Sequence, residues 1–470
     1  MTHPEADIPT PPGRGVAVLG GGVCGLYAGL TLARAEVPVT VLESEPIPGG
    51  LAAGHRRGAN FYDLGVHMLH AFDPEIFATA AEAMGDERIA IDLDAKIRWA
   101  GHFYRYPLQF GDMIRAMPPV LLARCVAGLL VAHARTSLRP TEPKDAEEAL
   151  IQLYGKPLYR FFFERFTHRY WDIHPRDLSA TFIKSKMPRL TAVDAIKKML
   201  ASVGIKEKAA SVESALLHET LHYSRTGAET LPRSLALAIR QAGGHILTDA
   251  AVHRIELHEN AGTARVHYGD RGDSLTCTDV ISTIPIPILL GALRPTPPPE
   301  VLEASTHLRY RPMAVYGLLL NCPRALDALY IYYRERIFHR VGEPKNAGLV
   351  VSPPDHTILI VEMTCEIGDD RWNGAPEVIE HLYADLEAEG ICTRQQVVER
   401  HLLRSPTAYA LFNRGFEPHL ATVQAYLDSL PILASTGRQG GFTFPNMHSA
   451  MRMGASAAQA ILAKTRRAQG

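Results

Sequence analysis

The sequence lacks the cysteine pairs, the charge excess and the export signal that would indicate several classes of protein. None of its six cysteines has the spacing of a zinc site or a disulfide framework: Cys24, Cys125, Cys277, Cys322, Cys365 and Cys392. The formal net charge is -1, from 49 basic and 50 acidic residues, which does not predict binding to nucleic acid. Residues 1–14 are polar and rich in proline, so we expect a short leader and no export signal. A cytoplasmic location with reduced thiols is expected.

The sequence also has little that could cross a membrane. Its most apolar stretch, residues 117–134, begins at Pro118-Pro119 and contains Arg124 and His133. These interruptions favour a helix packed on the protein over a spanning helix, although such a helix could form an apolar wall for a lipid-like substrate. In the absence of a hydrophobic tail or a clear basic amphipathic helix, we expect no stable membrane anchor.

A glycine-rich turn follows the first apolar run of the chain. Residues 15–19 form this run, which is typical of a strand buried in a parallel sheet. Gly20, Gly22 and Gly25 follow at the GxGxxG spacing, in which the glycines allow a tight turn, close approach of a pyrophosphate and close helix packing. Residues 26–35 then have the pattern of a helix whose N-terminus would face the phosphates.

A second apolar run ends in an acidic residue. Residues 37–42 form this run, and Glu43 follows it at the distance where a carboxylate can bind ribose hydroxyls. Gly49 and Gly50 come soon afterwards, and such a pair is used by FAD proteins rather than NAD proteins. The order of these features predicts dinucleotide binding, with a structural glycine turn in another α/β fold as the alternative.

Other segments predict that the cofactor domain is assembled from distant parts of the chain. Residues 279–285 and 432–438 read as strands, and residues 451–464 read as a helix rich in small residues. The region between residues 74 and 217 has mainly helical periodicity, with helices expected at 146–153, 159–169 and 192–203. Four strands are expected in a later region, at 314–320, 329–333, 348–352 and 357–363.

These patterns predict an α/β fold with three kinds of region. A discontinuous Rossmann-like FAD-binding domain is expected in three parts, 13–73, 223–300 and 409–470. A helical lobe would be inserted at 74–222, and a mixed β-sheet substrate domain would cover 301–408. The substrate is expected to enter between the helical lobe and this sheet.

The chain resembles the flavoprotein group that includes UDP-galactopyranose mutase, protoporphyrinogen oxidase and the flavin amine oxidases, from residue 15 to residue 463. The segments that carry the resemblance are 49–52, 63–70, 103–108, 166–171, 227–232, 243–252, 437–442 and 446–448. Within the segment 243–252, residues 246–252 are expected to form a strand. The resemblance implies the FAD fold of the group. It places cofactor contacts at Gly20, Gly22, Gly25, Glu43, Gly50, Leu51, Val252, Gly437, Arg438, Asn446, Met447 and His448.

Within this group the sequence is most similar to the sugar mutase. The resemblance implies an isomerase that interconverts the pyranose and furanose forms of a nucleotide-activated sugar through reduced flavin N5. Its candidate catalytic residues are His67, His70, Arg189 and Arg340. The two arginines would hold the leaving pyrophosphate, because negative charge develops there. Substrate contacts are expected at Tyr104, Trp171, Tyr223 and Tyr409.

Some residues depart from the mutase pattern and leave other functions open. Asn446 stands where the mutase has an aspartate, and residues 361–364 and 368–372 are more similar to redox relatives. The alternative is an FAD-dependent oxidoreductase: an oxidase, dehydrogenase or desaturase with an external electron donor or acceptor. His67 and His70 could position the flavin rather than react, and Trp171 could be a packing residue. No metal site is expected, and the oligomeric state stays open.

Overall fold

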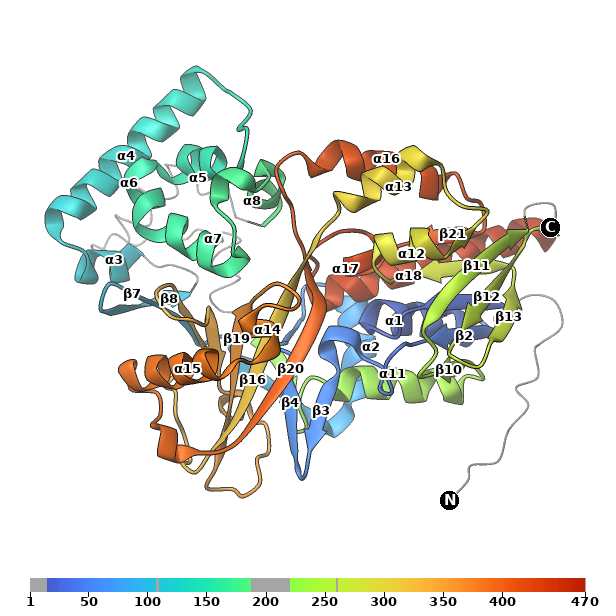
Figure 1. The fold of residues 1–470 in the computed structure, drawn as a ribbon, viewed down its shortest axis with the longest axis horizontal. Helices are drawn as coiled ribbons and strands as arrows, with labels where there is room; N and C mark the ends of the chain where they lie inside the picture. Colours follow the sequence, from blue (N-terminus) through green and yellow to red (C-terminus); the bar gives the residue numbers. More distant parts are fainter. Residues whose placement is uncertain (1–14, 107–109, 187–219, 259–260, 470) are drawn as a thin grey trace.

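The computed structural model describes residues 15–106, 110–186, 220–258 and 261–469, and its centre is a parallel sheet (Figure 1). The sheet has the strand order β10-β2-β1-β14-β21, and each neighbouring pair is parallel. Its strands are β1 (Val16–Leu19), β2 (Val39–Leu42), β10 (His245–Leu247), β14 (Asp279–Ser282) and β21 (Leu433–Ser435). Segments from the start, middle and end of the chain therefore form one sheet, as the sequence predicts.

Helices pack closely on this sheet through small residues. The helices next to it include α1 (Val23–Arg34), α2 (Pro74–Met84), α11 (Thr230–Gln241) and α18 (Met447–Gln469). A Cβ atom on Gly454 of α18 would lie 2.1 Å from the Cys24 carbonyl oxygen of α1. A Cβ atom on Gly29 would lie 2.9 Å from Val41 of β2. Larger residues at these glycines would push the C-terminal helix and the sheet away from α1.

A small mixed sheet, in which β15 pairs parallel to β11 and the other pairs are antiparallel, and three helices complete this half of the molecule. The small sheet has the order β13-β12-β11-β15. Its strands are β11 (Val252–His258), β12 (Thr263–Tyr268), β13 (Asp273–Cys277) and β15 (Leu293–Arg294). The helices are α12 (Ile286–Ala292), α13 (Pro299–Thr306) and α16 (Phe416–Asp428), and the short helix α17 (Gly437–Gly440) follows β21.

A seven-stranded sheet forms the other half and has the order β20-β16-β19-β18-β17-β7-β8. Its strands are β7 (Ala95–Trp99), β8 (His102–Tyr106), β16 (Tyr310–Leu320), β17 (Tyr330–Tyr333), β18 (Arg340–Gly342), β19 (Thr357–Thr364) and β20 (Val397–Ala410). Helices α14 (Asp370–Asn373) and α15 (Pro376–Ala388) accompany it. The parallel pairing of β17 with β7 joins an N-terminal hairpin to this later sheet.

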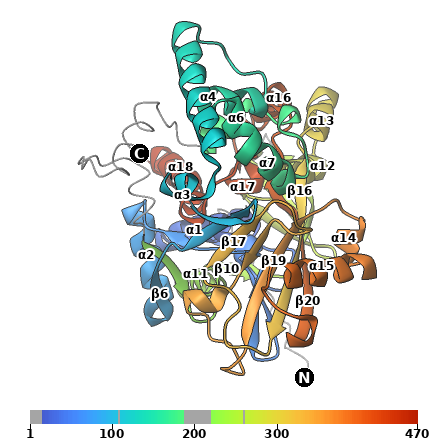
Figure 2. The same cartoon turned by 90° about the vertical axis from the view of Figure 1, so that its left-hand side faces the viewer.

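The helical lobe consists of α3 (Phe110–Ala116), α4 (Pro119–Leu138), α5 (Ala146–Tyr154), α6 (Lys156–Leu158), α7 (Glu164–Trp171) and α8 (Ala180–Lys186). A π-helical turn (Tyr159–Phe163) precedes α7, so the predicted helix 159–169 has two parts. The predicted helix 192–203 lies outside the described residues. Figure 2 shows α4 at the outer end of the lobe, away from the parallel sheet.

Three predictions about secondary structure are wrong. The region predicted as a helical lobe contains the strands β6 (Arg88–Asp92), β7 and β8, and β7 alternates between buried and half-buried residues as a strand should. Residues 348–352 do not form a strand. Gly348 has φ +93°, which is outside the strand conformation, and the Ser352 N–H donates to the Asn60 side chain instead of to a neighbouring strand. The strand predicted at 246–252 ends at Leu247, and Val252 begins β11.

Short strands connect the parts around the site. β3 (Gly54–Arg57) and β4 (Asn60–Asp63) form a hairpin, and β5 (Leu69–His70), β9 (Thr220–Ser224) and β6 form a three-stranded sheet in the order β5-β9-β6. The loop between β4 and β5 carries the predicted residue His67, and this loop passes close to strand β19.

Candidate active site

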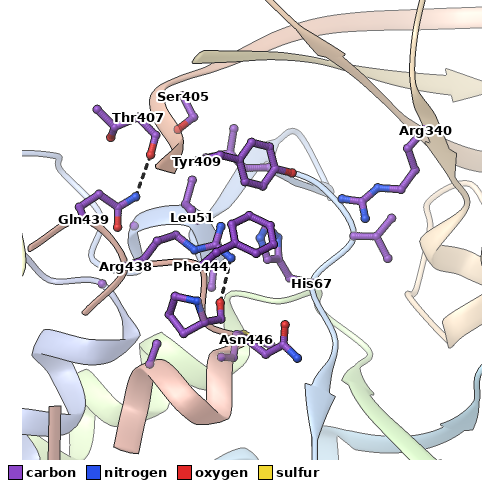
Figure 3. Close-up of a pocket in the computed structure, with 18 of the residues that line it drawn as sticks. Leu51, His67, Arg340, Ser405, Thr407, Tyr409, Arg438, Gln439, Phe444 and Asn446 are labelled. Carbon is purple, nitrogen blue, oxygen red and sulfur yellow. Dashed lines mark hydrogen bonds between the residues drawn. The ribbon is translucent and has the colours of Figure 1, made fainter. Parts of the chain in front are cut away.

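A cavity of about 1360 Å³ lies between the parallel sheet, the seven-stranded sheet and the helical lobe. Fourteen of the residues predicted for the site line it, although they span more than four hundred positions of the chain: Gly20, Gly22, Glu43, Gly50, Leu51, His67, His70, Trp171, Val252, Arg340, Tyr409, Arg438, Asn446 and Met447. Figure 3 shows part of this wall, in which Arg340 and the Tyr409 hydroxyl point toward the same space.

One end of the cavity has the form of a dinucleotide cradle. A Cβ atom on Gly22 would meet nothing within 4 Å, although Gly22 lines the cavity. The first turn of α1 begins at Gly22 without a side-chain cap, so its N–H groups are available to phosphate oxygens. Gly50 has φ +56°, and its Cβ atom would lie 3.2 Å from Gly22 Cα. The absence of side chains at Gly22 and Gly50 therefore leaves room for a pyrophosphate beside the backbone.

Glu43 lies at the end of β2, beside this cradle. Its carboxylate accepts hydrogen bonds from the Gly21 N–H at 2.7 Å and from the Glu45 N–H at 3.0 Å. These bonds fix the side chain while leaving acceptor positions for the hydroxyls of a ribose. The glycine turn, the uncapped helix and the acid together fit the adenosine half of FAD.

His67 lies at the other end, where the isoalloxazine would be held. Burial, with a further contribution from the Arg438 charge, lowers the pKa of His67 to about 4. The imidazole is therefore neutral near pH 7. Its Nδ1 atom is buried and has no hydrogen-bond partner among the described residues. A buried polar atom without a partner at a cavity wall fits a site that is completed by a bound group.

Arg340 forms the most extensively paired charge of the site. Its Nε and Nη2 atoms each donate to Glu362, at 2.7 Å, and its Nη1 donates to the Tyr332 hydroxyl at 3.4 Å. Glu362 is fully buried, and it also accepts the Val66 N–H at 3.2 Å. Burial alone would raise the pKa of Glu362, but Arg340 and His339 outweigh burial and lower it to about 2. The Arg340 charge is thus balanced inside the protein.

Arg438 is half-buried at the cavity and forms no salt bridge with a carboxylate of the described residues. Its Nη1 donates to the Ala408 carbonyl at 3.2 Å. Its Nη2 donates to the Pro445 carbonyl at 2.9 Å, which is the dashed bond below Arg438 in Figure 3. The guanidinium carbon lies 4.7 Å from the centre of the Phe444 ring and 5.6 Å from that of Tyr409. Burial lowers the pKa of Arg438, yet a guanidinium stays charged at neutral pH.

The remaining wall of the cavity is aromatic and aliphatic. Tyr170 lies 5.6 Å from Tyr409 between ring centres, and Trp171 lies 5.7 Å from Tyr409. Further apolar lining comes from the helical lobe and from β17: Met113, Cys125, Val126, Leu129, Tyr154, Leu158, Phe162, Phe163, Phe166, Tyr330 and Tyr332. This part of the cavity can surround an organic ring or chain and exclude water from it.

Several predicted site residues do not reach the cavity wall. Tyr104 is fully buried against Phe162 at 5.0 Å, which explains why it cannot contact a substrate there. His448 is buried next to the His70 ring, at 5.6 Å between ring centres. Gly25 and Gly437 act through packing: their Cβ atoms would lie 2.0 Å from the Gly20 carbonyl oxygen and 2.9 Å from Cys24 Sγ.

Arg189 lies outside the described residues, so its role stays a prediction. Tyr223, which we predicted as a substrate contact, is buried and its hydroxyl donates to the Asp63 carboxylate. The same carboxylate accepts the Ala228 N–H at 3.1 Å, and burial raises the pKa of Asp63 to about 6. Tyr223 therefore joins β9 to β4.

Tyr223→Phe is expected to destabilise the protein by roughly 1–3 kcal/mol, because a buried carboxylate loses one of its donors. Urea unfolding of the holoprotein measures this change. Tyr268→Phe, the same substitution at a half-buried tyrosine of β12, serves as the control and should cost much less. Equal stability of the two variants would show that the Tyr223 hydroxyl does not hold β9 on β4.

Sequence reasoning missed Glu362, Arg334 and Gln439. The signal for Glu362 was a single acid inside the otherwise apolar run of β19, where a charge must have a buried partner. Arg334 follows the aromatic strand β17, and its guanidinium lies over the ring of Phe162 at 4.8 Å. No local pattern indicates Gln439, whose Nε2 donates to the Thr407 carbonyl at 2.7 Å. Among the described residues no group of three potential ligands could hold a metal ion.

A glycine cradle, an acid placed for the ribose, and a largely apolar cavity with arginines on its wall define a flavin-binding enzyme. The chain belongs to the flavin containing amine oxidoreductase family, whose model matches residues 23–340. The protein is thus an FAD-dependent flavoenzyme, as the sequence predicts.

The individual relatives differ in their chemistry. Over 298 residues, 57% of this chain and 46% of the relative, the sequence is 23% identical to an inactive all-trans-retinol 13,14-reductase from Danio rerio. Over 172 residues, 36% of this chain and 45% of the relative, it is 20% identical to a dTDP-fucopyranose mutase from Escherichia coli. The matches span less than half the length of these two relatives.

The structure is also similar to that of a reduced UDP-galactopyranose mutase. The TM-score is 0.80 at 17% identity, and the match covers 96% of this chain and 94% of the other. This likeness confirms the predicted α/β FAD-binding fold. At this identity it shows the fold and not the reaction.

Proposed function

We propose that the protein is a mutase-like isomerase that interconverts the pyranose and furanose forms of a nucleotide-activated sugar while its flavin is reduced. The charge of the cavity carries this proposal. Among the described residues that line the cavity, the acids are Glu43 and Glu45, both at the ribose end, whereas six arginines line it: Arg56, Arg57, Arg334, Arg340, Arg404 and Arg438. A substrate with a diphosphate suits this wall, and a cationic amine does not.

The arginines near the flavin end differ in whether a carboxylate already balances their charge. Arg340 is balanced by Glu362, whereas Arg438 donates to backbone carbonyls only, and Arg334 donates to the Phe161 carbonyl at 3.0 Å. Arg334 Nε is buried without a hydrogen-bond partner among the described residues. Arg438 and Arg334 are therefore the groups that would stabilise a leaving diphosphate, because neither forms a salt bridge with a carboxylate in the part of the chain that the structure describes.

Bound FAD in its reduced form would supply a nucleophilic N5 for attack on the anomeric carbon. The protein's own residues orient the substrate and protect the reaction. The Arg438 guanidinium lies near the rings of Tyr409 and Phe444 and donates to backbone carbonyls, so its position is fixed. It would present one fixed cation to the leaving group. Neutral His67 can form a hydrogen bond to the bound group at Nδ1 without adding a charge to the site. The aromatic wall keeps water from the reacting sugar.

The test uses holoenzyme reduced with dithionite under anaerobic conditions and incubated with a panel of nucleotide sugars. An isomer of unchanged mass, formed with reduced but not with oxidised flavin, is the expected result. Arg438→Met should lower turnover by roughly a hundredfold, since one donor to the developing charge is lost. Arg394→Met, which removes an exposed arginine paired with Glu380, is the control and should leave turnover unchanged.

A second candidate is an FAD-dependent oxidoreductase that acts on an apolar substrate. The aliphatic and aromatic wall formed by Val126, Leu129, Tyr154 and Phe166 favours it. In this case no sugar isomer would form, and an apolar alcohol or polyene would change the redox state of the flavin in proportion to the product formed.

A further inference from the structure

The outward side of helix α4 carries apolar residues that the lobe does not cover. Val120, Leu130, Val131 and Leu138 have exposed fractions of 74%, 43%, 51% and 83%. At 100° per residue these four positions, with Ala123, Ala127 and Ala134, share one side of the helix, and we name these seven residues the outer face of α4. Figures 1 and 2 both show α4 at the periphery of the helical lobe.

The opposite side of α4 is committed to the lobe. Cys125 and Ala132 are buried, and a Cβ atom on Gly128 would lie 2.5 Å from Pro157 of α6. Of the described helices, α4 has the length and composition needed to cross a membrane. This close packing on α6, however, leaves a single side for lipid, which suits a helix lying in the plane of a membrane surface.

The charges of this region identify the chemistry of the surface that the outer face would meet. Arg124 and Arg135 are exposed next to the apolar stripe and form no salt bridge with a described carboxylate. Arg115 and Arg139 stand at the two ends, and the sequence has no acid between Asp112 and Glu142. An apolar stripe flanked by uncompensated arginines is complementary to a layer of anionic headgroups over acyl chains.

The same helix forms part of the cavity wall. Cys125, Val126 and Leu129 of its inward side line the cavity that holds the flavin site. One helix thus separates the apolar arm of the cavity from the exposed stripe. A membrane at the outer face would lie against the part of the protein that can take an apolar chain.

We infer that the outer face of α4 docks reversibly on an anionic phospholipid membrane. The helix lies along the surface, its exposed aliphatic side chains enter the boundary between headgroups and acyl chains, and Arg124 and Arg135 contact the phosphates. Such docking is peripheral and differs from a stable anchor. It stands apart from the sugar-mutase proposal, because neither the flavin nor the substrate takes part in it.

The experiment measures flotation of the holoenzyme with vesicles of phosphatidylcholine alone and of phosphatidylcholine with phosphatidylglycerol at 3:1. Binding to the anionic vesicles at low salt, with loss at high salt, is expected. Arg124→Gln/Arg135→Gln should weaken the binding by roughly thirtyfold, since each basic residue near an anionic surface contributes about fivefold. Val131→Glu/Leu138→Glu should abolish it.

The matched control is Leu237→Glu, which places the same acid at an exposed leucine of α11 and should leave flotation unchanged. Flavin absorbance checks that each variant keeps its cofactor and fold. The inference is overturned if the wild type ignores anionic vesicles, or if the α4 variants float like the wild type. It is also overturned if sedimentation shows that the wild type is a dimer that does not bind vesicles and that the α4 variants are monomers. The outer face would then be an interface between two copies of the chain.

Discussion

Replacing Gly22 with valine is expected to remove FAD from a protein that still folds. Gly22 has φ -70° and ψ 171°, a conformation that any residue adopts, and its Cβ atom would contact no protein atom within 4 Å. The new side chain would extend into the space that the glycine leaves for the pyrophosphate. We expect Gly22→Val to weaken FAD binding by roughly a hundredfold, which corresponds to about 2.7 kcal/mol, and Gly22→Ala by about tenfold.

The measurement is the flavin content of the purified variants, from absorbance at visible wavelengths, followed by titration of the apoprotein with FAD. Circular dichroism reports whether the fold is retained. Gly291→Val is the control: Gly291 lies exposed on α12, and its Cβ atom would also meet nothing within 4 Å. Normal flavin content in Gly22→Val would show that the cofactor phosphates lie elsewhere.

Gly25 shows why the two glycines should behave differently. Its Cβ atom would lie 2.0 Å from the Gly20 carbonyl oxygen, so a larger residue there would distort the turn itself. A variant at Gly25 would lose FAD together with stability, whereas a variant at Gly22 should lose FAD alone. Comparing the two separates the packing role of the motif from its binding role.

The sequence could predict the cofactor end of the site because that end depends on short-range patterns. The glycines of the turn, the strand before them and Glu43 lie within about thirty residues, and each position is set by backbone geometry. The strands β14 and β21 could be predicted for a related reason, since parallel strands covered by helices appear as largely apolar runs.

The substrate end could not be predicted equally well, because it depends on pairing between distant segments. Strands β7 and β8 lie in a region of helical periodicity, and β7 is placed by its pairing with β17, more than two hundred residues later. The resemblance implies substrate contacts at Tyr104 and Tyr223, but both side chains are buried away from the cavity. Their burial depends on which neighbours fill the core, and no local pattern records that.

Glu362 is another site residue whose role depends on pairing between distinct strands. The charge inside the apolar strand β19 could be noticed in the sequence, but its partner Arg340 is supplied by the neighbouring strand β18. Only the antiparallel register, in which Arg340 faces Glu362 across the ladder, explains why a buried acid is tolerated there.

Removing the Glu362 carboxylate is expected to be the most destabilising single change at the site. Glu362→Ala would leave the Arg340 guanidinium without its carboxylate and would remove the acid 3.5 Å from the buried His339 Nε2. It would also free the Val66 N–H of the loop that carries His67. Loss of one partner of a buried ion pair costs roughly 3–5 kcal/mol. The control is Glu380→Ala at the exposed pair with Arg394, which should cost less than about 1 kcal/mol. Urea unfolding of the two holoproteins measures the difference.

The pH dependence gives this prediction a second readout. The pKa of Glu362 is lowered from 4.5 to about 2 in the folded protein, so its contribution to stability is present above about pH 4.5 and is lost as the pH falls toward 2. His67 adds a separate loss between pH 6.5 and about pH 4, because the folded protein resists protonation of its buried imidazole. Glu362→Gln should keep the loss due to His67 and remove the part of the loss below pH 4.5 that is due to Glu362, while Asp73, whose pKa the Arg452 guanidinium lowers to about 2, keeps its own part. An unchanged acid-unfolding curve in Glu362→Gln would mean that the Arg340 charge is balanced by another group.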